Sequence, residues 1–180
     1  PSGAIDLIPH LVEGWGPWED YVVAGGEYDP DYGIPRELGM VTASAPPIVV
    51  NGVIVVLVGH QPSYGQTRIE NVPGDIMGFD AVTGERLWKF HVIPRPGEVG
   101  HETWLNGAWR FSGDMSTWAP ASADPELGLV YLVTNASTVQ AYAGHRPGDN
   151  LFGGSVLALD VATGERRWHY QIPVSYTHLR

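Results

Sequence analysis

A fifteen-residue pattern that occurs twice restricts the fold of this chain more than any other feature of its sequence. Residues 74–88 read GDIMGFDAVTGERLW and residues 154–168 read GSVLALDVATGERRW, with seven identical positions. Each copy has an apolar stretch before an Asp, a Thr-Gly pair that begins three residues after the Asp, and a Trp four residues after the Gly. Recurrence of one such unit indicates a fold assembled from repeated supersecondary elements.

Each copy of the pattern predicts a β-hairpin with a defined turn. We expect Gly84 and Gly164 to adopt the left-handed backbone conformation that closes a type I turn, where a side chain would clash. We also expect the carboxylates of Asp80 and Asp160 to accept hydrogen bonds from the amides of their turns. The Trp of each copy then lies on the strand that follows the turn.

A second pair of strands precedes each hairpin. Before the first copy, two apolar stretches flank Asn51-Gly52, which is a strong signal for a two-residue hairpin turn. Before the second copy, residues 118–124 and 129–135 flank a turn around Pro125 to Gly128. The chain therefore predicts an all-β fold with two units of four antiparallel strands, roughly residues 44–93 and 118–173.

The run from Val53 to Val58 is apolar at every position, so both faces of this strand must be covered. Four-stranded sheets arranged radially around an axis cover one another in this way, which predicts two blades of a β-propeller. A lone β-sandwich is the alternative, but it would require alternation of apolar and polar residues that these strands lack.

Composition removes several classes of protein. Twenty acidic and ten basic side chains give a formal charge of −10, so a phosphate backbone would be repelled, and we expect no nucleic-acid partner. The chain has no cysteine, which excludes disulfides and thiolate chemistry. Apolar residues at 43% and charged residues at 17% indicate a folded, globular chain.

Two blades cannot close a propeller ring, because closure requires at least four. We interpret residues 1–40, rich in Gly, Pro and aromatic side chains, as a lead-in that could include part of a preceding blade. Residues 41–173 contain the two blades and long connecting loops, and residues 174–180 form a tail that we set aside. We expect this 180-residue piece to be poorly stable or to associate through its open sheet edges.

The repeat resembles the tryptophan-docking repeat of the quinoprotein dehydrogenases, in its second copy through Ala158, Asp160, Thr163-Gly164 and Trp168. The first copy departs from that repeat by having Gly78 where Ala is usual. The segments that connect the strands resemble the membrane-associated glucose and alcohol dehydrogenase branch of this family. These segments are residues 90–98, 101–104, 116–120, 123–131 and 142–150.

The resemblance implies an eight-bladed propeller that binds pyrroloquinoline quinone (PQQ) and Ca²⁺. The Trp of one blade would stack on the peptide around the Gly of the neighbouring blade. The implied activity is periplasmic oxidation of a sugar or alcohol hydroxyl with hydride transfer to the quinone. A quinone or cytochrome would accept the electrons, and the full-length protein could associate with a membrane. The alternative is a non-catalytic propeller of the same repeat that serves as a binding or assembly scaffold.

By the same resemblance, Trp118 matches the tryptophan that lies flat beneath the quinone, and Thr117 is a candidate hydrogen-bond partner beside it. The alternative for Trp118 is a core residue of an ordinary blade strand. Asn135 matches an amide ligand of Ca²⁺, and the alternative for Asn135 is a capping residue at a strand end.

Two further parts of the family's site have no match. A second Ca²⁺ ligand is expected in the loop after Gly59, but residues 60–62 read His-Gln-Pro and contain no carboxylate. The family pattern continues after the second repeat into a His-His-Asp-x-Trp-Asp segment whose aspartate is the candidate base. Here residues 172–180 read IPVSYTHLR, so we assign no catalytic residue and expect the fragment itself to be inactive.

Overall fold

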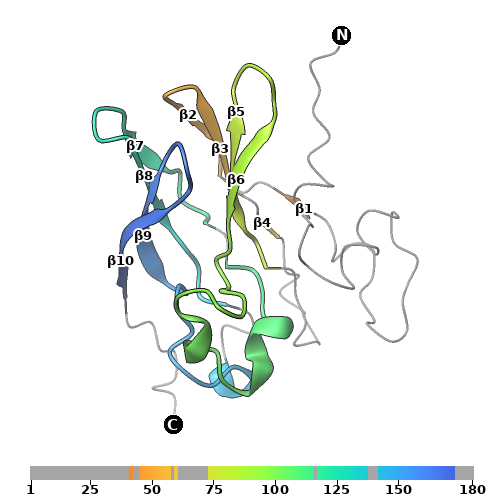
Figure 1. The fold of residues 1–180 in the computed structure, drawn as a ribbon. Coiled ribbons are helices and arrows are strands. Elements are labelled where there is room, and N and C mark those ends of the chain that lie inside the picture. The colour runs from red at the N-terminus through yellow and green to blue at the C-terminus, as the bar shows by residue number, and fades with distance from the viewer. Residues whose placement is uncertain are drawn as a thin grey trace, which may run out of the picture.

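The computed structural model describes residues 41–42, 45–57, 59–60, 73–115, 117–137 and 142–172. These residues form two four-stranded antiparallel sheets that lie side by side (Figure 1), which confirms the predicted pair of blades. The first sheet contains β2 (Ile48–Val50), β3 (Val53–Leu57), β5 (Ile76–Asp80) and β6 (Arg86–Phe90) in that order. The second contains β7 (Ser122–Asp124), β8 (Leu129–Val133), β9 (Ser155–Asp160) and β10 (Arg166–Gln171), also in chain order. The lead-in and tail interpretations, for residues 1–40 and 174–180, fall outside the described residues.

Smaller elements accompany the two sheets. A two-stranded ribbon that the sequence did not predict pairs β1 (Val41–Thr42) with β4 (Gly59–His60). Three 3₁₀-helices lie in the connecting segments: η2 (His101–Thr103), η3 (Leu105–Arg110) and η4 (Ala143–His145). None of the helices in the described part of the chain has the length and apolarity needed to cross a bilayer.

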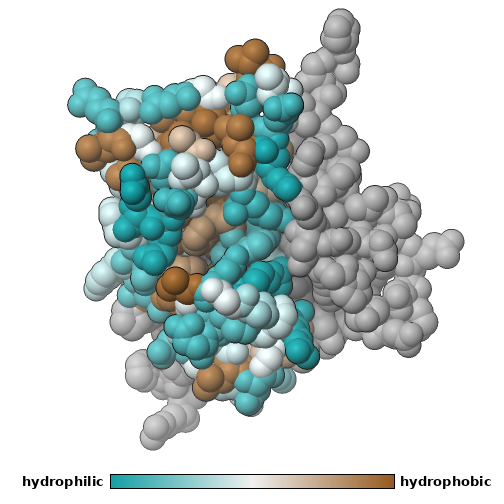
Figure 2. Space-filling model, in the orientation of Figure 1, coloured by the Kyte–Doolittle hydropathy of each residue, from teal (hydrophilic) through white to brown (hydrophobic). Residues whose placement is uncertain are grey.

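The strands give the pair of sheets two different ends, seen at the top and bottom of Figure 1. The turn end holds the short hairpin turns at residues 51–52, 81–84, 125–128 and 161–164. The loop end holds the longer connections, of which residues 73–75, 91–121, 134–137 and 142–154 are described. Hydrophobic surface is visible at the turn end in Figure 2, whereas the surface over the loop end is mostly hydrophilic.

The hairpin turns have the predicted geometry. Gly84 has a φ angle of 76° and Gly164 one of 72°, both in the left-handed region. The Asp80 carboxylate accepts hydrogen bonds from the amides of Val82 and Thr83, at 2.8 and 2.7 Å. These amides hold the pKa of Asp80 below its ordinary value, because they favour the ionised carboxylate. The corresponding bonds at Asp160 measure 3.0 and 3.1 Å.

A continuous hydrophobic core joins the two sheets. Val55 and Leu57 of β3 are fully buried, as the unbroken apolar run of that strand predicted. Across the interface, Leu132, Leu157 and Leu159 are equally buried on the second sheet. At about 25 cal/mol per Å² of apolar surface, burial on this scale is the main force that holds the sheets together.

The indole of Trp88 docks the first blade onto the second. Trp88 is only 7% exposed, and its Nε1 donates a hydrogen bond of 2.8 Å to the carbonyl oxygen of Val161. The ring lies against Gly164 so closely that a Cβ atom there would come within 2.6 Å of the indole. On its other side the ring covers Gly78, where an added methyl group would also overlap it. The predicted stacking of one blade's Trp on its neighbour's Gly turn is confirmed at this position.

The second docking tryptophan has a different environment. Trp168 is 43% exposed and its ring lies 6.0 Å from that of Tyr131 on its own sheet, with no further blade beside it among the described residues. It pairs in register with Ala158, as Trp88 pairs with Gly78. The prediction that both indoles clamp neighbouring blades is therefore wrong for Trp168 in this structure, because a docking tryptophan requires a following blade to bury it.

We expect Trp88→Ala to lower the free energy of unfolding by about 3–5 kcal/mol, because it leaves a cavity between the sheets and an unpaired Val161 carbonyl. Trp168→Ala is the matched control and should cost about 1–2 kcal/mol, since its ring is half exposed. Urea unfolding followed by circular dichroism measures both. Equal decreases in the free energy of unfolding for the two variants would show that docking between blades does not determine how much Trp88 stabilises the fold.

Gly78→Ala should also be destabilising, by about 1–3 kcal/mol, because the methyl group occupies the space of the Trp88 ring. We expect Trp88 fluorescence to shift to longer wavelength as its indole moves toward water. Ala158→Gly is the control at the equivalent position of the second sheet and should leave the emission spectrum unchanged. An unshifted spectrum in Gly78→Ala would contradict the close approach described here.

Candidate functional site

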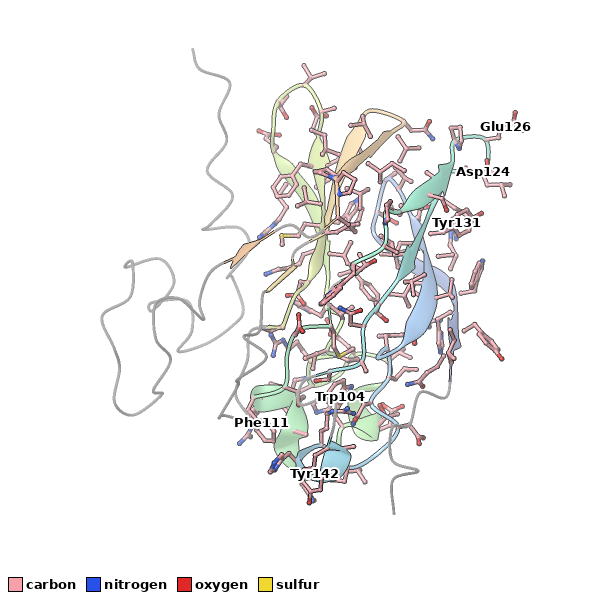
Figure 3. All side chains as sticks on the ribbon, turned by 180° about the vertical axis from the view of Figure 1, so that it is seen from behind. Trp104, Phe111, Asp124, Glu126, Tyr131 and Tyr142 are labelled. Carbon is pink, nitrogen blue, oxygen red and sulfur yellow. The ribbon has the colours of Figure 1, made fainter. Side chains whose placement is uncertain are left out.

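The residues proposed from the sequence as site residues lie at the loop end, where the chain enters β7 and leaves β8. Figure 3 labels Trp104, Phe111 and Tyr142 at this end, opposite Asp124 and Glu126 at the turn end. Thr117 and Trp118 precede β7, and Asn135 follows β8 by two residues. Because β7 and β8 are adjacent strands, the fold brings these positions to the same end of one sheet.

Trp118 is exposed at the entry to the second sheet. Its side chain is 53% exposed, and the residue lies outside strand β7. The alternative that Trp118 is a core residue of a blade strand is therefore wrong. A half-exposed indole of this kind offers one flat apolar face, which suits contact with a planar partner.

Thr117 is buried directly beside this indole. Its side chain is almost inaccessible to water, and its hydroxyl donates a hydrogen bond of 2.9 Å to the carbonyl oxygen of Ala119. This bond spans Trp118 and fixes the local backbone. The hydroxyl proton of Thr117 is thus engaged within the chain, which leaves only its oxygen lone pairs to face another partner.

Asn135 is held by its backbone, while its side-chain amide nitrogen has no partner. The Asn135 carbonyl oxygen accepts a hydrogen bond of 3.0 Å from the amide of Gly154. The Nδ2 atom is buried and makes no hydrogen bond in the described part of the chain. The structure therefore leaves the donor nitrogen of the Asn135 side chain with hydrogen-bonding capacity to spare.

The structure also shows a buried acid that sequence analysis missed. Asp114 is 0% exposed, and neither of its carboxylate oxygens has a hydrogen-bond partner within the described ranges. Its φ angle of 57° places a non-glycine residue in the left-handed region, a conformation that costs about 1 kcal/mol. Burial raises the pKa of Asp114 to about 7, because removal from water disfavours the charged form. In the sequence, Asp114 stands out only as a single charged residue between Gly113 and Met115.

Two contacts locate Asp114 between the first sheet and the loop that carries Asn135. The amide of Met115 donates a hydrogen bond of 3.2 Å to the carbonyl oxygen of Pro73. On the other side, the Ser137 hydroxyl donates one of 3.2 Å to the carbonyl oxygen of Gly113. The residues immediately before and after Asp114 are thus attached to two different segments of the loop end.

A second buried acid lies on one of these segments. Asp75 is fully buried, and Lys89 Nζ lies 3.6 Å from its Oδ2. Neither carboxylate oxygen of Asp75 has a hydrogen-bond partner in the described part of the chain. This ion pair balances the charge of Asp75, whereas no ion pair of this kind is found at Asp114 among the described residues.

Hydrogen bonds to the neighbouring loops make this end of the second sheet rigid. Trp104 Nε1 donates to the carbonyl oxygen of Leu151 at 2.5 Å, and the Leu151 amide donates to the Thr103 hydroxyl at 2.9 Å. Arg146 donates to the side-chain oxygen of Asn150 at 2.7 Å. The long connection that follows Asn135 is therefore anchored onto the segment that precedes Asp114.

The described residues contain no group of three or more His, Cys, Asp or Glu side chains that could bind a metal ion. A hard cation here would need amide and carbonyl oxygens, or oxygens of another molecule, in addition to carboxylates. Among the loop-end side chains with unpaired polar atoms, Asp114 carries carboxylate oxygens and Asn135 also carries an amide oxygen, which are the ligand types that such a cation prefers.

The fold and the docking tryptophan define the class of protein as a β-propeller of the tryptophan-docking type. The sequence matches the family "PQQ: Glucose/ethanol/alcohol dehydrogenase, beta-propeller domain" over residues 24–174. The chain therefore belongs to this family of quinoprotein dehydrogenases, as the repeat indicated.

Individual relatives agree with this assignment. The chain is 37% identical over 164 residues to the glycerol dehydrogenase large subunit of Gluconobacter oxydans, covering 90% of this chain and 20% of that protein. It is 34% identical over 135 residues to the quinoprotein glucose dehydrogenase of Escherichia coli, covering 74% of this chain and 16% of the relative. The chain thus spans about a fifth of the length of the curated relatives it matches.

Solved structures show the same fold. The quinohemoprotein alcohol dehydrogenase of Comamonas testosteroni superposes with a TM-score of 0.60 at 29% identity, covering 73% of this chain and 20% of that one. The quinohemoprotein alcohol dehydrogenase ADH-IIG of Pseudomonas putida gives a TM-score of 0.62 at 30% identity, with the same coverage.

Proposed function

We propose that the protein is a PQQ-dependent dehydrogenase that oxidises a hydroxyl group of an alcohol or a sugar. The match to the dehydrogenase family over residues 24–174 carries this proposal. The half-exposed Trp118 at the loop end supports it, because an exposed indole offers a flat apolar surface to a planar cofactor. The relatives are named for glycerol, glucose and alcohols, so we propose the substrate only as an alcohol or a sugar.

The residues present fit the cofactor and its cation in three respects. The exposed face of Trp118 would lie beneath the planar quinone and keep water from one of its faces. The oxygen of the Asn135 side chain would ligate Ca²⁺, while its buried and unpaired Nδ2 could donate a hydrogen bond to the cofactor. Thr117 would hold the backbone of Trp118 through its bond to Ala119.

When bound, PQQ supplies a two-electron acceptor for the hydride of the substrate, and Ca²⁺ polarises the quinone. The chain's own residues orient and shield these groups. The carboxylate that takes the substrate proton is expected from the His-His-Asp-x-Trp-Asp segment, which the sequence of this chain does not contain. We therefore propose that residues 1–180 alone form part of the cofactor-binding site but do not oxidise the substrate.

By family, we further propose that the protein acts in the periplasm and passes electrons to a quinone or a cytochrome. Several relatives are named as quinohemoproteins, and one is named as a lupanine 17-hydroxylase with cytochrome c as its partner. Association with a membrane is proposed because the connecting segments of this chain resemble the membrane-associated branch of the family.

The test is PQQ binding by the protein with the whole of its natural chain, followed by reduction of an artificial dye. We expect dye reduction with glucose, glycerol or a primary alcohol when both PQQ and Ca²⁺ are added, and none when either is omitted. A protein that binds PQQ in no condition would contradict the proposed function and favour a scaffold.

Trp118→Ala should weaken PQQ binding about 10- to 100-fold, since the planar cofactor loses the apolar surface beneath it. Trp118→Phe should lose less, because a smaller flat ring remains. Trp168→Phe makes the same chemical change at another half-exposed indole, on strand β10, and should leave the PQQ affinity unchanged. If Trp118→Phe and Trp168→Phe weaken binding equally, or if Trp118→Ala leaves the PQQ affinity unchanged, Trp118 does not support the cofactor.

A further inference from the structure

We propose that Asp114 supplies a carboxylate ligand to a hard cation at the loop end, beside Asn135. This inference deepens the proposed function, on which it rests, because it concerns the cation of the same site. Neither the family's pattern in this sequence nor the resemblance assigns any role to Asp114.

The first step concerns the carboxylate itself. Both oxygens of Asp114 are buried without a donor, although nearly all buried polar groups in folded proteins have a partner. No Lys, Arg or His lies within ion-pair distance of it among the described residues. A buried acid with neither donors nor a countercharge is unfavourable, so the chain retains at this position a group whose partner is another molecule or ion.

The second step concerns its surroundings. On one side of Asp114, Met115 is hydrogen-bonded to Pro73. On the other side, Gly113 is hydrogen-bonded to Ser137, which follows Asn135 by two residues. Gly153 confirms that these segments are neighbours, since a Cβ atom there would lie 3.7 Å from Met115 Cε and 3.8 Å from the Asn135 carbonyl oxygen. The buried carboxylate of Asp114 and the side-chain amide of Asn135 therefore lie on adjoining segments of the loop end.

The third step concerns the kind of ligand. Carboxylate and amide oxygens together suit a hard cation, and carboxylates provide the charge that retains it. Residues 60–62, where the resemblance leads us to expect a Ca²⁺ ligand after Gly59, contain no carboxylate. Asp114 offers such a charge from a different segment. A neutral molecule would need a donor at this point and would leave the anionic form of Asp114 without compensation.

The test uses the protein with its whole natural chain, freed of metal by a chelator, and two probes, Ca²⁺ and Tb³⁺. Binding is measured as tryptophan-sensitised Tb³⁺ luminescence and as the rise in melting temperature with each cation. Asp114→Asn keeps the shape of the side chain and removes its charge. Asp149→Asn makes the same change at an exposed acid whose side chain takes part in no described contact.

We expect Asp114→Asn to weaken Tb³⁺ binding about 10- to 100-fold and to abolish the Ca²⁺-induced rise in melting temperature. Without cation, the same variant should melt at a higher temperature than the wild type, because an unpaired buried acid has been removed. Asp149→Asn should change neither measurement. If the role of Asp114 were purely structural, Asp114→Asn would melt at a lower temperature than the wild type in the absence of cation.

Asp114→Gly is a second variant for the case in which Asp114→Asn fails to fold, since glycine readily adopts the positive φ angle at this position. It should also lose the cation while remaining folded. Wild-type cation affinity in either variant overturns the inference, as does failure of both variants to fold.

The outcomes also separate this inference from the proposed function. A protein that binds PQQ but whose cation affinity does not depend on Asp114 retains the proposed function and loses this inference. A protein that binds neither PQQ nor a cation contradicts the proposed function itself.

Discussion

The structure depends on one indole held between two glycines of different sheets. Trp88 covers Gly78 on its own sheet, lies against Gly164 on the next, and donates to Val161. In this structure the ring approaches both glycines so closely that a Cβ atom at either position would overlap it. This contact sets the distance and angle between the blades, and the hydrophobic core between them then excludes water. With the blades fixed, their connecting loops meet at one end.

Site chemistry follows from that arrangement. Strands β7 and β8 bring Trp118 and Asn135 to the same end of one sheet, and the loops from the first sheet reach them through the bond between Met115 and Pro73. At the turn end, the carboxylates of Asp80 and Asp160 each accept two hydrogen bonds from backbone amides. The loop end differs because its buried polar groups have capacity to spare. This asymmetry supports the proposal that the cofactor binds at the loop end.

Much of this fold could be predicted because local chemistry determines it. The Asp and Thr-Gly of each repeat fix a turn without help from the rest of the chain, and the unbroken apolar run of β3 requires two covered faces. The burial of Trp88 followed from the same repeat. The exposure of Trp168 could not be predicted, because it depends on whether another blade covers the ring rather than on the repeat.

The candidate site was only partly predictable for a similar reason. The resemblance made Trp118 and Asn135 candidates, since both lie in recognisable segments next to strands of the second sheet. Asp114 carries no such motif: its burial arises where segments from two blades meet, and a single acid in a Gly-rich stretch usually faces solvent. The internal bond of Thr117 to Ala119 was likewise hidden, because side-chain geometry decides which partner a hydroxyl selects. Tertiary contacts, rather than local sequence, determine these features.

An experimental structure of the protein with its whole natural chain, bound to PQQ and Ca²⁺, tests the central claim most directly. The account predicts that the quinone lies parallel to and in contact with the Trp118 ring, above two blades joined by the Trp88 indole. A cofactor bound away from the loop end, or a Trp88 ring turned out into solvent, would contradict it.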